Sequence, residues 1–390
     1  MDLSLILLGL PLAFLLGWWA SRADLKQLRV ENRQSPKAYF KGLNFLLNEQ
    51  QDQAIDAFIE AVQLDPDTSE LHFALGNLFR KRGEYDRAVR VHEHLIARAD
   101  LSQTDRDRAH YALAMDYLRA GILDRAEAVL QTLLTTPYAP TARLALLSIY
   151  ERTRDWAQAA ATAQALQTSG EGNFDARQAH YLCEQAARCV QDGQLETALG
   201  LLDQAQRIAP RVDRPPLEMA QLLERMNQPE KAYDSLVRLI DANSIATPLA
   251  APALARIAIQ LGRESLARPM LDRAYAHQAS LDVLDARLAL APHNDAPSDD
   301  SSPDAEQAQS LLLKHLQQES SLIAAEQWLQ LEHAAGRLVV VPIEQAIAKA
   351  TRPLRKYRCA ACGFETQHHY WNCPGCQAWD SYPPRRIEEL

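Results

Sequence analysis

Small and apolar residues recur between positions 36 and 280 at a period that predicts a series of paired helices. One marker is an alanine that returns at intervals of 33 to 39 residues, as Ala54, Ala88, Ala126, Ala159, Ala198, Ala232 and Ala267. Twelve residues before each alanine stands another small or apolar residue, in turn Gly42, Gly76, Ala114, Leu147, Ala186, Ala220 and Ala255. Small side chains at two fixed points let neighbouring helices approach closely, while larger apolar residues fill the remaining space.

This period resembles the tetratricopeptide repeat (TPR), in which each unit is a pair of antiparallel helices. The fourth and later units lack several aromatic residues of that pattern. We predict an all-α fold with a TPR solenoid over residues 36–291. Stacked units of this kind bury a continuous core and leave a concave surface, which favours a binding function.

An uncharged run precedes the repeats. Residues 3–20 carry no charge, and a helix rising about 1.5 Å per residue over this length nearly crosses a hydrocarbon core of about 30 Å. Trp18 and Trp19 end the run, where aromatic rings favour the membrane interface. A cleaved signal peptide usually has positive charge before its apolar run, whereas only Asp2 precedes this one. We predict an uncleaved, single-pass transmembrane anchor over residues 1–21.

The charges beyond the anchor predict its direction. A juxtamembrane linker is expected over residues 22–35, and the cations in and just after it are Arg22, Lys26, Arg29, Arg33 and Lys37. Because positively charged flanks stay in the cytoplasm, the bulk of the chain is expected on the cytoplasmic side of the membrane.

The composition changes after the repeats. Residues 292–305 are rich in Pro, Ser and Asp and predict a solvated linker. Residues 306–350 are expected to be helical, with one amphipathic helix over residues 307–333. A solenoid needs a terminal cap, and whether this segment supplies it stays open.

Charge and cysteine usage exclude some classes of protein. The 390-residue chain has a net charge of −9, which argues against general nucleic-acid binding. Four of the six cysteines form one late cluster, so a disulfide framework is not expected and a reducing compartment fits better. The other two, Cys183 and Cys189, fall within a repeat and are interpreted as small buried side chains.

The late cluster has the spacing of a metal site. Cys359, Cys362, Cys373 and Cys376 form two C-x-x-C pairs with ten residues between them. Such pairs supply four thiolates to one tetrahedral ion, and either zinc or iron is compatible with them. We predict a module over residues 351–390 that holds one structural metal ion. Aromatic residues are expected to wrap the two turns, namely Tyr357, Phe364, Tyr370, Trp371 and Trp379.

A basic run precedes the cysteines and consists of Lys349, Arg352, Arg355, Lys356 and Arg358. It weakly favours a nucleic-acid-binding zinc ribbon. Because the whole chain is acidic, we prefer a solvated or membrane-facing strand and expect no nucleic-acid partner.

A second set of cations falls at one equivalent position near the end of the first helix of each repeat. The residues there are Leu47, Lys81, Arg119, Arg152, Gln191, Arg225 and Gln260, with Arg80 and Arg256 close by. This position tends to face the concave surface of TPR folds. The cations predict either an ordinary solvated face or a track for an acidic partner, to which Arg donates bidentate hydrogen bonds.

The order of anchor, repeats and cysteine module resembles the lipopolysaccharide assembly protein B family of Gram-negative bacteria. The resemblance covers nearly the whole chain and includes the stretches YRCAACGF at 357–364 and YWNCPGCQAW at 370–379. It implies a rubredoxin-like metal-binding module. This chain departs from true rubredoxins by a short loop between the cysteine pairs and by Gln377 after the second pair. These departures argue against electron transfer and leave the metal's identity open.

The resemblance also implies a non-enzymatic adaptor in the cell inner membrane. Such a protein delivers the deacetylase of the committed step of lipid A synthesis to a membrane-anchored AAA+ zinc protease, and so restrains lipopolysaccharide biosynthesis. Other lipopolysaccharide synthesis and transport proteins are further expected partners. The alternatives are a rubredoxin-like electron-transfer protein, which needs a reversibly cycling iron, and a general TPR scaffold for envelope assembly.

Overall fold

The structure, a computed structural model, describes residues 39–390 except 243, 291–302, 320, 335–340 and 353. It consists of two compact units that meet between Glu171 and Gly172, and each is described by itself. The predicted anchor and juxtamembrane linker, and most of the linker at 292–305, lie outside the described residues. No helix among the described residues has both the length and the apolar character needed to cross a membrane.

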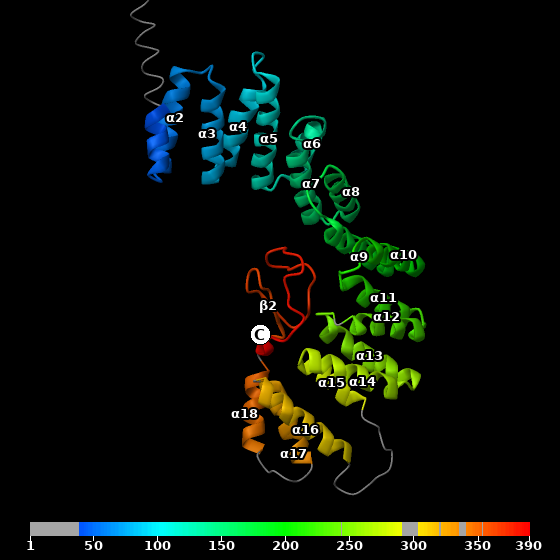
Figure 1. Cartoon of the computed structure of the whole chain (residues 1–390). Coiled ribbons are helices and arrows are strands. Elements are labelled where there is room, and N and C mark those ends of the chain that lie inside the picture. The colour runs from blue at the N-terminus through cyan, green and yellow to red at the C-terminus, as the bar shows by residue number, and fades with distance from the viewer. Residues whose placement is uncertain (1–38, 243, 291–302, 320, 335–340, 353) are drawn as a thin grey trace, which may run out of the picture. The chain divides into compact units, whose positions relative to one another are not determined.

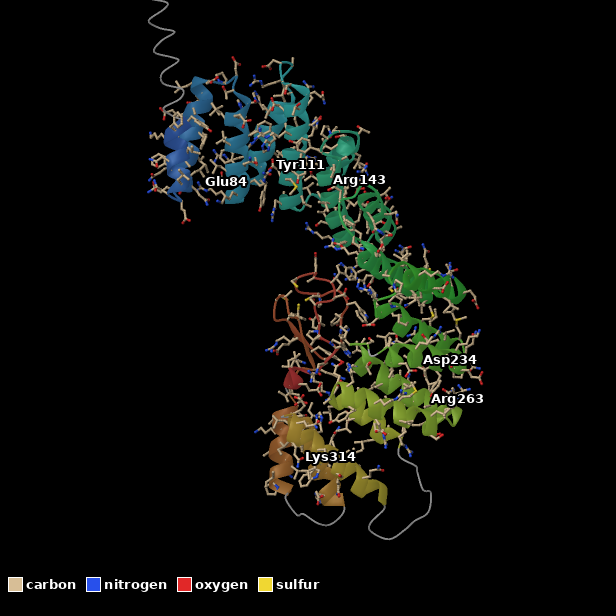
Figure 2. All side chains as sticks on the ribbon, viewed as in Figure 1. Glu84, Tyr111, Arg143, Asp234, Arg263 and Lys314 are labelled. Atoms are coloured by element: carbon tan, nitrogen blue, oxygen red, sulfur yellow. The ribbon has the colours of Figure 1, made fainter. Side chains whose placement is uncertain are left out.

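Unit 1 consists of helices joined by short turns (Figure 1). Residues 39–47 are helical. They are followed by α2 (Gln51–Leu64), α3 (Ser69–Arg82), α4 (Tyr85–Ile96), α5 (Gln103–Ala120), α6 (Leu123–Thr132), the short η1 (Leu133–Thr135), α7 (Ala139–Thr153) and α8 (Trp156–Thr168). Each predicted repeat of this unit is a pair of packed helices, and side chains fill the space between them (Figure 2).

Unit 2 continues the pairs and adds two further parts. The repeats comprise α9 (Asp175–Gln191), α10 (Leu195–Ile208), α11 (Arg214–Arg225), α12 (Pro229–Asp241), α13 (Thr247–Leu261) and α14 (Glu264–His277), with α15 (Leu281–Ala289) after them. Next come α16 (Pro303–Gln318), α17 (Leu322–Ala334) and α18 (Val341–Thr351). The cysteine module contains strands β1 (Tyr357–Arg358) and β2 (Glu365–Thr366), which pair antiparallel, and the short helix η2 (Ile387–Glu389).

The repeating small residues lie where the helices pack. All seven alanines of the first column are fully buried, at 0% exposure. The residues twelve positions earlier are buried as well. The two glycines in that second column make the closest approaches: a Cβ on Gly42 would lie 2.8 Å from the Phe58 ring, and one on Gly76 would lie 2.5 Å from His92 Nε2. The predicted all-α array of helix pairs is therefore confirmed.

A buried carboxylate joins three helices of unit 1. The side chain of Asp116 in α5 is fully buried and accepts a hydrogen bond from Arg80 of α3 at 2.9 Å. Its other oxygen is hydrogen-bonded to His92 Nδ1 of α4. Because a buried charge is stable only when paired and hydrogen-bonded, this contact links the second repeat to the third.

The predicted single helix over residues 307–333 is wrong, because two helices, α16 and α17, occupy that stretch. The Ser321 hydroxyl accepts a hydrogen bond from the Ala324 amide, as a capping residue does at a helix start. Leu312 of α16 and Ala324 of α17 form a buried cluster with Leu281 and Leu284 of α15. These helices therefore cover an apolar face of α15.

Candidate metal centre and its contacts with the repeats

The four late cysteines come together in the fold. Their sulfur atoms all lie within 4.8 Å of one another. The Sγ atoms of Cys359 and Cys376 are 3.8 Å apart, and those of Cys362 and Cys373 are 3.7 Å apart. Thiolates at 2.3 Å from a tetrahedral ion would be separated by about 3.8 Å. The donor set and its spacing therefore fit one metal ion bound by four thiolates.

Two similar turns position the sulfurs. The Gly363 amide donates to the Cys359 carbonyl at 2.9 Å, and the Gln377 amide donates to the Cys373 carbonyl at 2.8 Å. Both residues have left-handed backbones, with φ of 78° at Gly363 and 61° at Gln377. The sequence departure at Gln377 therefore keeps the shape of the turn, although this conformation is less favourable for a side chain with a Cβ.

Hydrogen bonds favour the thiolate at Cys359 and Cys373. At Cys362 the hydrogen bond with the Phe364 backbone lowers the pKa, but desolvation and the neighbouring cysteine side chains outweigh it and raise the pKa to about 12. Burial raises the pKa of the Cys359 thiol, but a hydrogen bond with Ser381 and hydrogen bonds with two backbone amides outweigh it and lower the pKa to about 6. The Cys359 Sγ to Ser381 Oγ distance is 3.3 Å. Tyr382 OH lies 3.7 Å from Cys373 Sγ, and this hydrogen bond helps to lower the pKa of Cys373, against burial, which raises it. Because the thiolate is the metal-binding form, these contacts prepare the site for a cation.

The module has a small core that touches the repeats. Tyr357, Tyr382, Cys359 and Cys373 are buried together, and Leu249 of α13 packs against them. Trp371 packs against the large apolar cluster of α11 to α15. The prediction that five aromatic residues wrap the cysteine turns is confirmed for Tyr357, which is buried with Cys359 and Cys373, and for Phe364, which lies against Gly375 of the second turn. It needs correction for Trp371 and Trp379, which contact the repeats.

A second contact between the cysteine module and the repeats is centred on His180 of α9. Its side chain is fully buried, and Trp379 stacks on it with ring centroids 4.9 Å apart. Its Nε2 lies 2.8 Å from Asp380 Oδ2. Asp380 has a left-handed backbone with φ of 51°, a conformation that Asp tolerates better than most residues.

A third contact involves Asp282 of α15, which is 4% exposed. Its Oδ1 accepts hydrogen bonds from Lys356 Nζ at 2.7 Å and from the Arg386 guanidinium at 2.9 Å. Arg386 also reaches Asp285, and the carboxylate of Glu389 accepts a hydrogen bond from the Leu281 amide. Residues on both sides of the cysteine cluster are therefore joined to the start of α15.

The predicted cations near the helix ends fall into two groups. Lys81, Arg119, Arg152 and Arg225 are exposed, and among the described residues they have no ion-pair partner. Arg80 instead binds the buried Asp116, and Arg256 makes two hydrogen bonds to Glu224, at 3.1 and 2.7 Å. Arg80 and Arg256 therefore link neighbouring repeats.

The two remaining cysteines and two cations of the basic run contact other parts of the fold. Cys183 is buried and Cys189 is partly buried within the apolar cluster of α9 and α10, and burial raises the pKa of the Cys183 thiol. In the basic run, Lys356 binds Asp282, and Arg358 lies 3.9 Å from Glu365. The sequence did not identify His180 and Asp282 as contact residues. His180 pairs with Asp380, 200 positions away, and Asp282 pairs with Arg386, 104 positions away, so no local pattern marks either residue.

Comparison with known proteins agrees with this architecture. A rubredoxin metal binding domain profile matches residues 357–383, and a tetratricopeptide repeat profile matches residues 41–93 and 111–176. The chain is 31% identical to lipopolysaccharide assembly protein B of Escherichia coli (strain K12), and the match covers 98% of both chains. A protein of the same name from Haemophilus influenzae is 28% identical over 99% of both chains. The solved TPR2AB domain complex of yeast Sti1 matches at 16% identity with a TM-score of 0.34, over 67% of this chain and 100% of that chain.

Proposed function

The chain belongs to the lipopolysaccharide assembly protein B family, and we propose that it is a non-enzymatic adaptor that regulates lipopolysaccharide biosynthesis at the cell inner membrane. Its relatives are named for lipopolysaccharide assembly, and its repeats are of the kind that bind other proteins. The observation that carries the proposal is the match over 98% of both chains, which includes the anchor region, the repeats and the cysteine module.

The adaptor brings two proteins together. One is the deacetylase of the committed step of lipid A synthesis, and the other is a membrane-anchored AAA+ protease that degrades it. Other lipopolysaccharide synthesis and transport proteins share the scaffold. The predicted anchor at residues 1–21, with its uncharged run at residues 3–20, holds the adaptor beside its membrane-bound partners, which raises their effective concentration.

In unit 1, an acidic partner segment binds along a row of exposed cations, which we call the cation row. It consists of Lys81, Arg119 and Arg152, which lie in the last turns of α3, α5 and α7. Their charge is opposite in sign to the net charge of −9 of the whole chain. Because Arg donates two parallel hydrogen bonds to a carboxylate, such a row suits Asp- or Glu-bearing segments. Arg225 occupies the equivalent position in unit 2.

Charge reversal tests the row. Arg119→Glu with Arg152→Glu is expected to abolish co-purification of the deacetylase and protease from detergent-solubilised membranes and to raise the cellular level of the deacetylase. Arg90→Glu with Arg207→Glu changes the same charge at exposed positions outside the row and is the matched control. Equal partner capture by both folded double variants would refute the row as a binding surface.

The membrane location has its own test. An alkaline phosphatase fusion following residue 390 is expected to be inactive, because the positive flank of the anchor keeps the bulk of the chain in the cytoplasm. Phosphatase activity from that fusion would contradict the orientation. Removal of residues 1–21 is expected to leave a folded chain with reduced control of the deacetylase, and full control by this shortened chain would show that tethering is unimportant.

The bound ion, zinc or iron, holds the shape of the cysteine module and its contacts with α9, α13 and α15. The electron-transfer alternative requires a reversible one-electron couple at the same four thiolates. A chain loaded only with zinc is therefore expected to retain partner capture. Loss of function on replacing iron by zinc, with the fold unchanged, would favour electron transfer.

A further inference from the structure

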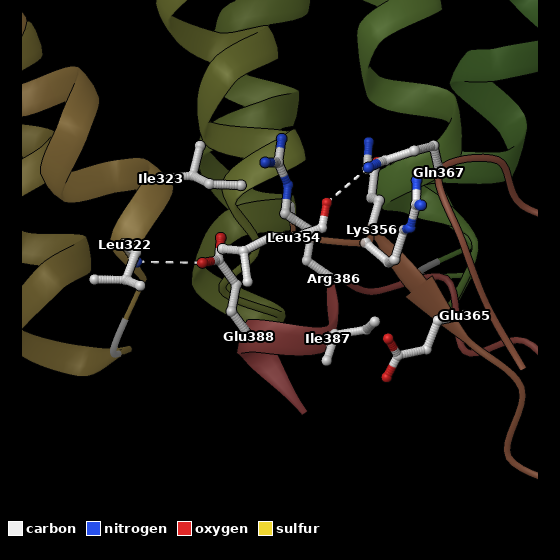
Figure 3. A pocket seen from close by; sticks show the side chains of 10 residues that line it. Leu322, Ile323, Leu354, Lys356, Glu365, Gln367, Arg386, Ile387 and Glu388 are labelled. Atoms are coloured by element: carbon white, nitrogen blue, oxygen red, sulfur yellow. Dashed lines mark hydrogen bonds between the residues drawn. The ribbon is translucent and has the colours of Figure 1, made fainter. Parts of the chain in front are cut away.

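A cavity of about 430 Å³ lies where α17, the cysteine module and residues 386–388 meet. This volume is within the range of roughly 300–1,000 Å³ that small ligands and short peptide anchors occupy in proteins. In Figure 3, Leu322 and Ile323 of α17 lie on one side of it and Glu365 and Gln367 on the other, with Leu354 and Ile387 between them. The cavity is distinct from the cysteine cluster and from the cation row.

The cavity exposes aliphatic side chains to solvent. Leu322 is 47% exposed and Leu354 is 37% exposed, which places both among the large apolar residues that the fold leaves uncovered. Ile323 and Ile387, both partly buried, complete the apolar part of the wall. Covering such a surface with an aliphatic side chain is favourable by about 25 cal/mol per Å² of apolar area removed from water.

The charged groups of the wall differ in how far they are already paired. Lys356 and Arg386 both bind Asp282, and Glu388 binds the Leu322 amide and the Ser321 hydroxyl at the start of α17. Arg355 is exposed and has no ion-pair partner among the described residues. The wall therefore offers one uncommitted cation next to its apolar surface.

We propose that this cavity binds a linear segment of a partner protein in which an aliphatic side chain is adjacent to a carboxylate. The aliphatic side chain covers Leu322, Leu354 and Ile387, and the carboxylate pairs with Arg355. This proposal rests on the adaptor function, since a scaffold must hold segments of its partners, and it assigns a second binding site outside the repeats.

The wall is better suited to a peptide than to an acyl chain. Aliphatic and charged residues are interspersed along it, as in Leu354, Arg355 and Lys356 and again in Arg386, Ile387 and Glu388. An acyl chain needs a continuous apolar lining, whereas a peptide with mixed side chains can match such a mixed wall. The side-chain amide of Gln367 donates to the Leu354 carbonyl at 2.6 Å and so joins one side of the cavity to its middle.

The cavity exists only when the cysteine module is folded and docked. Glu365 follows the first cysteine pair, and Gln367 follows strand β2. Lys356 and Arg386 keep their places through Asp282 of α15. A variant that unfolds the module is therefore expected to lose this cavity.

The experiment uses the full chain, loaded with metal and held in detergent micelles. The probe is a fluorescein-labelled pentapeptide amide, Gly-Glu-Leu-Leu-Glu, followed by fluorescence anisotropy. We expect Leu354→Ser and Arg355→Glu each to weaken binding about tenfold, because each removes one of the two contacts. The matched controls are Leu313→Ser and Arg352→Glu, which change an exposed leucine and an exposed arginine outside the cavity and are expected to leave the affinity unchanged.

Further probes separate the components of the interaction. Peptides with Gln in place of both Glu residues, or Ser in place of both Leu residues, are expected to lose at least tenfold in affinity. Binding that is absent at millimolar peptide, or equal in Leu354→Ser and Leu313→Ser, would overturn the proposal. The proposal would also be overturned if decanoate displaced the labelled peptide at a lower concentration than any unlabelled peptide does. That result would assign the cavity to an acyl ligand.

The double variant Arg119→Glu with Arg152→Glu distinguishes this site from the cation row of unit 1. Peptide binding at the cavity is expected to be unchanged in it. If that variant loses the whole-protein partners but keeps the peptide, both proposals stand. If it keeps both, the cation row fails while the cavity remains supported.

Discussion

The imidazole Nε2 of His180 lies 2.8 Å from the Asp380 carboxylate, and these residues are 200 positions apart in the chain. His180 belongs to a repeat helix, and Asp380 follows the second cysteine pair. With Trp379 stacked on the same ring, the contact makes the cysteine module part of the fold of unit 2. The module and the repeats of this unit are therefore expected to unfold together.

Two substitutions at Asp380 test that contact. Asp380→Asn keeps a side-chain oxygen for His180 and a residue type that tolerates the left-handed backbone, so little loss of stability is expected. Asp380→Ala removes the oxygen that pairs with His180 and places a residue that is less tolerant of the left-handed backbone. It is expected to lower the free energy of unfolding by about 1–3 kcal/mol. Urea unfolding followed by far-UV circular dichroism measures the difference, and equal stability of the two variants would contradict the role of the contact.

The metal site predicts a contrast between cysteines. Cys359→Ser or Cys373→Ser removes a buried thiol of the cluster and is expected to lower the bound metal per chain and unfold the module, because metal binding supplies much of its folding free energy. Cys183→Ala is expected to keep the metal, since Cys183 packs in the apolar cluster of α9 and α10. Metal analysis of the purified chains decides the matter. Full metal content after loss of Cys359 would exclude a four-thiolate site.

Asp282 is expected to be among the most sensitive acidic residues of unit 2. Asp282→Ala leaves Lys356 and Arg386 without their shared carboxylate, and breaking such a buried pair costs about 3–5 kcal/mol. Asp203→Ala is the control, because Asp203 forms an exposed pair with Arg207 whose loss costs about 0.5 kcal/mol. Denaturant unfolding compares them. Similar losses for the two variants would show that the Asp282 cluster contributes little.

Two helical glycines predict opposite effects of the same change. Gly76→Ala places a Cβ 2.5 Å from Nε2 of the buried His92, which is held by Asp116, and a loss of about 1–3 kcal/mol is expected. Gly200→Ala in α10 meets no atom within 4 Å and is expected to stabilise by about 0.5–1 kcal/mol through helix propensity. Thermal unfolding of both variants tests the pair, and a gain in stability for Gly76→Ala would contradict the packing described for α3 and α4.

Stability is expected to depend on pH through His315. Burial lowers the pKa of this imidazole, whose Nδ1 lies 2.8 Å from Tyr275 OH. The unfolded chain then binds a proton near pH 6.5 while the folded chain does not, so this contribution is intact above that pH and is lost as the pH falls. Between pH 7.5 and 6.0 the loss is expected to be less than about 1 kcal/mol. His315→Gln removes it, so an unchanged pH dependence of the urea midpoint would refute the assignment.

Much of the fold was predictable because the repeats are local. A helix pair places its contacts within one period, so the alanine column could be recognised by spacing alone, and all seven alanines are fully buried. The cysteine cluster was recognisable for the same reason, since two short turns bring all four sulfurs together. Gln377 is compatible with this cluster as well, because its left-handed backbone gives the second turn the same shape as Gly363 gives the first.

The contacts that were not predicted join distant parts of the chain. Trp371 and Trp379 were assigned to the cysteine turns, although the repeats supply their partners. The single-helix prediction passed over a polar run at residues 317–321, and the break between α16 and α17 falls there. The groups that cap the start of α17 come from Ser321 and from Glu388. A side chain that pairs across the fold leaves no periodic mark on the sequence.

Residues 386–389 are synthesised after the helices of unit 2 that they contact, and this order affects how the chain folds on the ribosome. Until Arg386 and Glu389 emerge, Asp282 lacks one of its cations and the Leu281 amide lacks its acceptor. Earlier helices can fold as they appear, but these contacts form only after residues 386–389 have been translated. In a chain that stops before Arg386, Asp282 would pair with Lys356 alone, so α15 is held by fewer contacts until residues 386–389 have been added.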